Sequence, residues 1–508
     1  MPADAEAPAL SADPALFLRL ASIGKKAAAD LQALKTSPVL KTRPVLKTKP
    51  GLKTKPGLKT GKARRWRKRS HVLRLLDTAE GNLRQAGWLC AAIDDTPLLL
   101  PLLPALPDPP MIEDLGALQI LARGTLISES CSLPDSASPQ PHAITLHAIT
   151  LEGRQYHAVQ IDGPRTNSLG LATQLTETCM LYWDGAHPLV QLAQQLGLVP
   201  NKPLWANQIP LALPQPENLH ELDALSACCA MLRHALAQVD GNISCLLAAQ
   251  DSEGVHQMRV ALRRLRSVLA LHRGLLPADA VQTVRAELAW LNAPLGRRRD
   301  LDVFVEETLA PLRRALPDLQ GLHDLAIHLD EKRAAAQQAL LSAFRSPRFT
   351  RLRLALEALC HQPPATEPPP ALQHAALLLQ RRRRKLKKLG RRLGECSEAE
   401  LHELRILAKK LRYAVEFYRP LFKGRSKSAR RHAQGLARLQ DALGALNDAA
   451  VGAQLLRNLL GMPAEDPVAA AIAGWFAARQ HGQLAGLPAA WEAYAELKPF
   501  WKAALPPE

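Results

Sequence analysis

The chain of 508 residues carries 65 Lys and Arg against 47 Asp and Glu, which gives a formal net charge of +18, and only 4% of its residues are aromatic. The length predicts two to four domains, the Ala- and Leu-rich composition favours helix, and the positive charge favours phosphate-rich partners. No stretch of about 18 uncharged apolar residues occurs, which argues against a membrane-spanning helix.

Residues 1–70 are predicted to form a disordered basic arm. They hold 17 Lys and Arg against 4 Asp and Glu, and from Leu34 a six-residue repeat reads LKTSPV, LKTRPV, LKTKPG and LKTKPG. A proline in each repeat prevents a continuous helix, and the like charges keep the chain extended. Two interpretations stay open, a solvated linker without a dedicated ligand and a segment that contacts polyanions non-specifically.

Residues 71–214 are predicted to form a smaller α+β domain. The segments HAITLHAITLEG and RQYHAVQIDG alternate between apolar and polar residues and are typical of strands, whereas AHPLVQLAQQLGLVP is typical of a short helix. This region holds 6 basic residues against 13 acidic ones. The positive charge of the chain therefore lies in the arm and in the C-terminal half.

Residues 215–508 are predicted to be helical almost throughout. A proline-rich stretch, HQPPATEPPP at 361–370, separates two halves of about 215–361 and 371–505. Apolar periodicity predicts helices near 219–249, 252–272, 278–295, 299–314, 320–344 and 348–361, and then near 371–394, 398–421, 427–446, 448–460, 466–482 and 487–503.

One motif occurs in both halves, VHQMRVALRRLR at 255–266 and LHELRILAKKLR at 401–412. Offsets of 0, 3, 7 and 10 share one face of a helix. This face carries an imidazole and three fixed cations in each copy, namely His256, Arg259, Arg263 and Arg266, and then His402, Arg405, Lys409 and Arg412. A row of like charges is unfavourable unless an anion lies against it. Two such rows predict a long polyanion held between them, and the alternative is a pair of solvated helix faces.

A second motif follows the first in each half. LAWLNAPLGRRRDLDV at 288–303 and LARLQDALGALNDAAV at 436–451 share the pattern LxxLxxxLGxxxD. Two motifs repeated in the same order predict a duplicated helical bundle with a pseudo-twofold axis. The glycines of the pattern, Gly296 and Gly444, either end a helix or permit close packing. Its aspartates, Asp300 and Asp448, either orient nearby arginines or cap helices.

A further basic run, RRRRKLKKLGRR, spans 381–392. Its nine basic positions cannot all share one helix face, so some of them must point to solvent. Four that do share a face are predicted to extend the anion site: Arg381, Arg384, Lys385 and Lys388. The alternative is a solvated face. Arg297 and Arg298 are weaker candidates of the same kind.

The repeated motifs resemble those of the CHAD family, the conserved histidine α-helical domain, over about residues 215–505. The resemblance implies a mainly α fold in which two pseudo-symmetric four-helix bundles surround a basic central channel. It also implies binding of inorganic polyphosphate without catalysis and without a cofactor or metal. The eight residues of the two motif faces would be the binding set, and Arg264 and Lys410 are weaker candidates beside them.

Residues 73–89, LRLLDTAEGNLRQAGWL, and 173–198 weakly resemble the CYTH family, the triphosphate tunnel metalloenzymes. That family's opening ExExK motif is absent, and no paired arginines follow Trp88. A triphosphate tunnel needs many cations, and Mg²⁺ needs several carboxylates. We therefore expect a degenerate, inactive domain with a scaffold role. Metal-dependent triphosphatase activity of this region and non-specific nucleic-acid binding are the alternative functions.

The eight cysteines include no CxxC pair and no Cys/His cluster with zinc spacing, which is typical of a reducing compartment. The N-terminal residues lack the charged segment and apolar core of a secretory signal. These features predict a cytoplasmic protein, and the family resemblance adds polyphosphate or storage granules as a candidate location. Nothing in the sequence predicts the oligomeric state.

Overall fold

The structure is a computed structural model. It describes residues 16–20, 34–35, 66–101, 117–133, 142–183, 188–199, 219–249, 252–460 and 466–505, except for short gaps at 87, 164, 179–180, 363, 365–366 and 423. The chain forms two compact units. One comprises residues 1–211, 236–258 and 341–361, and the other comprises residues 212–235, 259–340 and 362–508.

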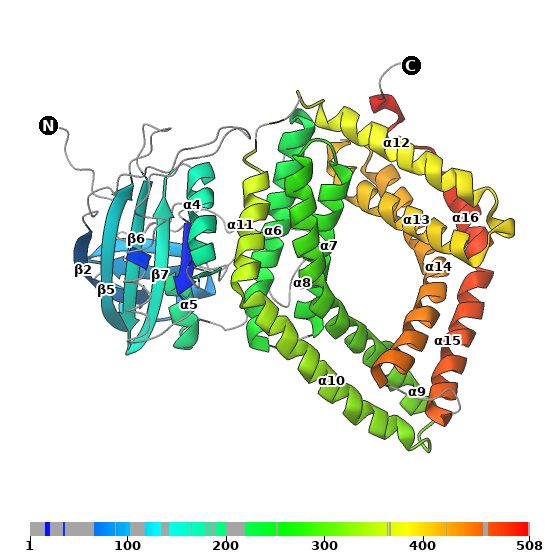
Figure 1. Cartoon of the computed structure of the whole chain (residues 1–508), viewed down its shortest axis with the longest axis horizontal. Coiled ribbons are helices and arrows are strands. Elements are labelled where there is room, and N and C mark those ends of the chain that lie inside the picture. The colour runs from blue at the N-terminus through cyan, green and yellow to red at the C-terminus, as the bar shows by residue number, and fades with distance from the viewer. Residues whose placement is uncertain are drawn as a thin grey trace, which may run out of the picture. The chain divides into compact units, whose positions relative to one another are not determined.

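The first unit contains one antiparallel sheet with the strand order β4-β3-β2-β5-β6-β7-β1-β8 (Figure 1). Its strands are β1 (Leu16–Leu20), β2 (Arg67–Asp77), β3 (Trp88–Ile93), β4 (Thr96–Pro101), β5 (Gln119–Leu133), β6 (His142–Leu151), β7 (Arg154–Asp162) and β8 (Leu181–Tyr182). The turn between β6 and β7 has positive φ angles at Glu152 and Gly153, 47° and 75°. Such angles match the right-handed twist of the flanking strands, so this turn favours a tight hairpin.

Strand β1 differs from the prediction of a disordered arm. Residues Leu16–Leu20 pair with β7 on one side and with β8 on the other. Further along the arm, Leu34 is fully buried in the same core as Leu18, and Lys35 pairs with Glu129. The backbone N–H and C=O groups of the mostly apolar segment LFLRL pair with the free edge of β7 despite the basic residues that follow it. The LKT repeats between residues 36 and 65 lie outside the described residues.

Each face of the sheet has its own core. On one face, Leu75, Leu126 and Ile149 pack with Leu189 and Leu192 of α5 (Pro188–Gln195). On the other face, Ile144 and Val159 pack with Leu169 of α4 (Arg165–Thr178) and with Leu354 of α11 (Pro347–Leu359). The helix α11 therefore completes a core of the sheet, which explains why part of the helical region belongs to the first unit.

A buried ion pair fixes α11 and α6 (Ala224–Ala249) to the end of the sheet. The guanidinium of Arg353 donates to both carboxylate oxygens of Asp240 at 2.9 to 3.1 Å and to Glu357 at 3.1 Å. The same guanidinium lies 4.5 Å from the ring centre of Trp183, whose indole N–H donates to Asp240 at 3.0 Å. This cluster is not predicted by any sequence motif.

The rest of the described chain is helical, which confirms the mainly α fold with an antiparallel sheet region. The first half continues with α7 (Ser252–Leu271), α8 (Ala278–Phe304), a π-helical turn (Val305–Leu309), α9 (Ala310–Ala315) and α10 (Gly321–Phe344). The second half contains α12 (Ala371–Gly390), α13 (Glu398–Tyr418), α14 (Ser426–Leu460), α15 (Pro467–Ala485) and α16 (Leu487–Ala495). Within the described residues, no helix combines the length and the hydropathy that crossing a membrane requires.

Of the two interpretations of Gly296 and Gly444, the end of a helix does not apply, because α8 and α14 run through both positions. An interior glycine costs a helix only about 0.5–1 kcal/mol relative to alanine. The leucines that precede these glycines, Leu295 and Leu443, are fully buried and hold the helices in place. A Cβ atom at Gly296 would lie 3.4 Å from the Arg259 guanidinium, so this glycine leaves room for a side chain of the first motif.

In the second unit, α13 packs against α12 and α14, and α14 packs against α15 and α16 (Figure 1). The Ser397–Glu400 capping box begins α13. Gly390 at the end of α12 lies against Trp491, where a Cβ atom would come within 2.1 Å of the ring. In another core, Ile472 and Val468 of α15 pack with Leu325 of α10 and Leu312 of α9, so helices of both halves share one core.

Candidate functional site

The two copies of the repeated motif lie on α7 and α13. Their apolar positions are buried, with Leu262 and Leu265 on α7 and Leu404 and Leu411 on α13 each at most 1% exposed. The predicted polar face is half-buried at His256, Arg259, Arg263, Arg405 and Arg412, and exposed at Arg266, His402 and Lys409. The helical period thus separates the core side of each motif from its charged side.

Arginines from both motif copies meet at one aromatic ring. The guanidinium carbon of Arg263 on α7 lies 5.0 Å from the ring centre of Tyr413, and that of Arg412 on α13 lies 5.1 Å from the same centre. The two guanidinium groups therefore cannot lie further apart than the sum of these distances. Tyr413 itself is only 8% exposed.

Lys409 shows that further cations of both helices share this region. Its pKa is lowered to about 8, first because neighbouring protein atoms displace part of the water around the ammonium, although the side chain stays exposed, and then because of the positive charges of Arg405, Arg263, Arg259 and Arg266. Charges act on one another strongly only over short distances in water. Five cations from α7 and α13 therefore contribute to one positive field.

Acidic partners compensate only part of this charge. Arg259 lies 3.4 Å from Asp300, and Arg412 donates to Glu416 at 2.7 Å and to Gln440 at 2.6 Å. Within the described part of the chain, no carboxylate forms an ion pair with Arg263, Arg266 or Lys409. These three cations are therefore available to pair with an anion from outside the protein.

The residues Arg297–Asp300 on α8 have different roles. Asp300 lies inside the helix and contacts Arg259, so it orients an arginine and does not cap a helix. Arg298 is 4% exposed and forms a buried ion pair with Asp302, to which Arg333 also donates at 2.9 Å. Arg298 is therefore a structural residue and a poor binding candidate, whereas Arg297 is exposed. The side chain of Asp448 lies outside the described residues.

The basic run on α12 also separates by face. Arg382 donates to the carbonyl of Lys410, Arg383 to that of Leu497 at 2.8 Å, and Lys387 to that of Ala495 at 3.1 Å. These three side chains stabilise the packing of α12 on its neighbours. The four residues predicted to extend the anion site are all exposed, namely Arg381, Arg384, Lys385 and Lys388.

The structure also shows a stacked pair of histidines, one buried and one half-buried, that no motif indicates. His272 and His374 stack with their ring centres 5.4 Å apart, and Nδ1 of His272 donates to the Val268 carbonyl at 3.0 Å. Burial lowers the pKa of His272 to about 3 and lowers that of His374 as well. The imidazole of His272 is therefore neutral at physiological pH and belongs to the core, and the half-buried His374 stacks on it.

In the sheet region, the residues that resemble the CYTH family have a structural role. The carboxylate of Asp77 is fully buried and accepts the backbone N–H groups of Thr78 and Leu83 at 2.8 and 2.9 Å, and it also pairs with Arg84. This carboxylate therefore closes the turn after β2. Over the described residues, no group of three or more His, Cys, Asp or Glu side chains is placed to hold a metal ion.

A network of buried polar groups crosses β5, β6 and β7 on one face of the sheet. His147 lies 2.9 Å from the Ser128 hydroxyl and 2.8 Å from Gln160, whose amide donates to Asp162 at 2.8 Å. Burial lowers the pKa of His147 to about 4, so this imidazole is neutral. Ser128 is only 5% exposed, which leaves its hydroxyl without access to a substrate.

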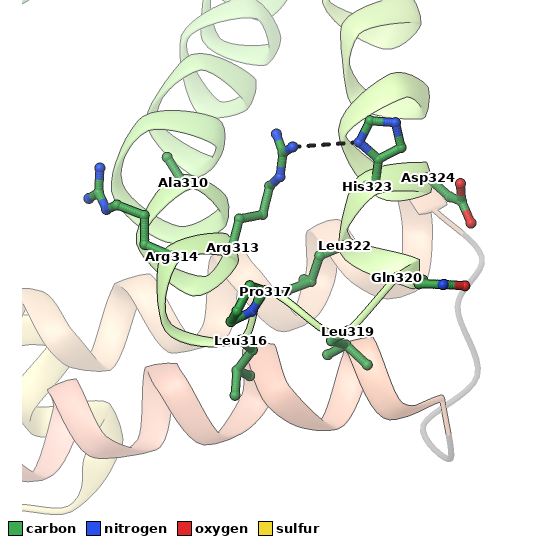
Figure 2. A pocket seen from close by; sticks show the side chains of 10 residues that line it. All are labelled: Ala310, Arg313, Arg314, Leu316, Pro317, Leu319, Gln320, Leu322, His323 and Asp324. Carbon is green, nitrogen blue, oxygen red and sulfur yellow. Dashed lines mark hydrogen bonds between the residues drawn. The ribbon is translucent and has the colours of Figure 1, made fainter.

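The pocket of Figure 2 lies at the turn between α9 and α10. Arg313 and His323 line it with a nitrogen–nitrogen distance of 3.5 Å, and Leu316 and Leu322 form its apolar part. Arg313, Arg314, His323 and Asp324 are all exposed. The pocket is thus an open hollow whose polar groups are in contact with solvent.

Comparisons with known proteins agree with the helical region. A scan against protein-family models matches the CHAD domain at residues 230–457. The chain is 31% identical to a crystallised CHAD domain from the plant Ricinus communis, over 55% of this chain and 94% of that chain, with a TM-score of 0.46. It is 21% identical to PptA from Streptomyces chartreusis, over 54% of this chain and 99% of that chain, with a TM-score of 0.40. A comparison with curated proteins finds no match. The family match does not include the sheet, so the CYTH-like resemblance stays a prediction.

Proposed function

Because the chain belongs to the CHAD family, we propose that it is a non-catalytic protein that binds inorganic polyphosphate between α7 and α13. The binding residues of this proposal are the eight of the motif faces. They are His256, Arg259, Arg263 and Arg266 on α7, and His402, Arg405, Lys409 and Arg412 on α13.

The convergence of cations from two helices supports this proposal. Arg263, Arg266 and Lys409 share a field that no described carboxylate neutralises, and the lowered pKa of Lys409 indicates its strength. A polyanion with one negative charge per repeating unit supplies compensation along the whole row. Guanidinium groups form charge-assisted hydrogen bonds with phosphate oxygens, and a fixed arrangement reduces the entropy lost on binding.

Two further parts of the chain extend the proposal. The exposed face of α12, formed by Arg381, Arg384, Lys385 and Lys388, adds phosphate contacts beside the central site. The basic arm, residues 1–70, adds avidity through a second weak contact with the same polymer. A protein with such contacts would gather at polyphosphate or storage granules, which a fluorescent fusion imaged with a polyphosphate stain would test.

Binding of polyphosphate is tested with the full chain and two triple variants at two salt concentrations. The first variant, Arg263→Gln, Arg266→Gln and Lys409→Gln, removes three cations of the site that have no carboxylate partner among the described residues. The second, Arg285→Gln, Arg313→Gln and Arg314→Gln, removes as many exposed charges from α8 and α9. We expect binding to weaken about a hundredfold in the first variant only, since three charge-assisted contacts are lost.

Equal weakening of both variants, together with a collapse of binding in moderate salt, would mean that only the net charge of the protein acts. The two alternative functions have their own readouts. Release of phosphate from tripolyphosphate in the presence of Mg²⁺ or Mn²⁺ would indicate triphosphatase activity. Displacement of polyphosphate by DNA as readily as the reverse would indicate non-specific nucleic-acid binding.

A further inference from the structure

Tyr413 lies between the two copies of the motif. It follows Arg412 on α13, and its ring lies within 5.0 Å of the Arg263 guanidinium and 5.1 Å of the Arg412 guanidinium. We propose that Tyr413 is a positioning residue, whose ring holds one arginine of each motif copy so that both guanidinium edges face the same anion. This inference rests on the proposed polyphosphate function.

The ring fixes the two cations without occupying their donors. A guanidinium over an aromatic face is attracted by the quadrupole of the ring, while its five N–H groups point outward in the plane of the guanidinium. The ring therefore leaves the N–H groups of Arg263 available to phosphate oxygens, and on Arg412 it leaves those that Gln440 and Glu416 do not accept. A carboxylate in the same position would accept the same N–H groups and would neutralise the charge. An aromatic ring therefore orders these arginines and keeps the site positive.

The two arginines depend on the ring to different degrees. Arg412 is also fixed by Glu416 and Gln440, at 2.7 and 2.6 Å. Arg263 has no carboxylate partner among the described residues, so the ring is its main constraint. Loss of the ring is therefore expected to release Arg263 first.

One ring serves both copies of the motif. At the offset of 146 residues, the position in the first copy that corresponds to Tyr413 is Ser267. The hydroxyl of Ser267 donates to the carbonyl of Arg263 in the preceding turn at 2.8 Å and offers no aromatic surface. The charged faces are repeated in the sequence, but the residue that organises them occurs in one copy only. The anion site is thus asymmetric, with its most ordered part near Tyr413.

Three variants of the full chain test this role. Tyr413→Phe keeps the ring, and Tyr413→Leu removes it with little change in volume. Phe304→Leu removes another buried ring, 5% exposed, from the core between α8, α10 and α15. We expect polyphosphate to bind Tyr413→Phe and Phe304→Leu as it binds the unmodified chain. Tyr413→Leu should bind about tenfold more weakly, while its melting temperature falls no further than that of Phe304→Leu.

The titration of Lys409, followed by NMR without ligand, is a second and independent measurement. The charge of Arg263 contributes to the lowered pKa of Lys409. Release of Arg263 in Tyr413→Leu should move this pKa up toward its ordinary value, and Tyr413→Phe should leave it in place.

Unchanged binding and an unchanged Lys409 titration in Tyr413→Leu would overturn the inference. So would a loss of binding in Tyr413→Phe as large as that in Tyr413→Leu, because the ring would then not be the active feature. If the unmodified chain does not bind polyphosphate, the proposed function fails. The Lys409 titration still decides in that case whether Tyr413 holds the arginines.

Discussion

The hydroxyl of Tyr418 lies 3.2 Å from Nε2 of His272, and the two residues are 146 positions apart, which is the offset between the two motif copies. Each residue lies 16 positions after the histidine of its own motif. Because Nδ1 of His272 donates to the Val268 carbonyl, Nε2 carries no proton and accepts the hydrogen bond of Tyr418. Corresponding ends of α7 and α13 are therefore joined by a buried hydrogen bond.

Removal of this hydrogen bond should destabilise the fold and leave anion binding intact. We expect Tyr418→Phe to lower the free energy of unfolding by about 1–2 kcal/mol, because Nε2 of His272 would be buried without a partner. Urea denaturation measures this loss, and a double-mutant cycle with His272→Leu isolates the pair. Strictly additive effects of the two substitutions would contradict a direct interaction.

The same histidine should make the stability of the protein depend on pH. The pKa of His272 is about 3 in the folded chain, below its ordinary value of 6.5, because burial disfavours the imidazolium. Below about pH 6.5 the unfolded state binds a proton that the folded state does not, so stability falls as the pH falls. We expect the stability of the unmodified chain relative to His272→Gln to decrease by about 1.4 kcal/mol per pH unit between pH 6 and 4. A constant difference over this range would show that His272 is protonated in the folded state.

The fold could be predicted largely from the sequence, because leucines recur with the helical period and the charged faces repeat at fixed offsets. Of the two interpretations of Gly296 and Gly444, the end of a helix does not apply, because buried leucines in the adjoining turns offset the small cost of a glycine. Strand β1 was not predicted, because a five-residue, mostly apolar segment is a weak signal beside a long run of lysines. Those errors concern local signals that tertiary packing overrides.

The charged faces of the site were predictable, and the residue that brings them together was not. Offsets of 0, 3, 7 and 10 select Arg263 and Arg412 and leave out Tyr413, which contacts both only because α7 lies beside α13. Equally, no local pattern places Trp183 against Arg353. A comparison of the two copies beyond the motif would have drawn attention to His272 and Tyr418, since they occupy corresponding positions in the two copies. It would not have indicated that they touch.

Lys409 should take up a proton when a polyanion binds. Its pKa of about 8 reflects a partial loss of water around the ammonium and the charges of four arginines, and phosphate charges beside it would raise that value. Near pH 8 to 9 the free protein holds a partly neutral Lys409 and the complex holds a charged one. Affinity should therefore fall as the pH rises above about 8, and it should be constant below about 7, where Lys409 is charged in both states.

Calorimetry in buffers of different ionisation enthalpy measures the proton uptake, which Lys409→Arg should abolish. Equal uptake by Lys409→Arg would assign the proton to another group.

The ion pair of Arg353 should matter more for stability than any surface charge. The guanidinium is buried between Asp240 and Glu357 and covered by Trp183, so Arg353→Met would leave two carboxylates without their partner. We expect a loss of about 3–5 kcal/mol in the free energy of unfolding, as is usual when one side of a buried pair is removed. Arg345→Met, at an exposed position on the turn before α11, is the matched control and should change stability by less than about 0.5 kcal/mol.

Trp183→Leu extends this test to the contact between the sheet and α11. It removes the ring over Arg353 and the indole hydrogen bond to Asp240, so it should destabilise the chain by about 1–3 kcal/mol. The helical region cut away from residues 1–214 would lose the same contacts and the cover over Leu354, which is fully buried in the intact chain. The isolated helical fragment should therefore melt at a lower temperature than the full chain. The sheet would contribute nothing to the stability of α11 if the fragment were as stable as the full chain, or if Trp183→Leu were as stable as the unmodified chain.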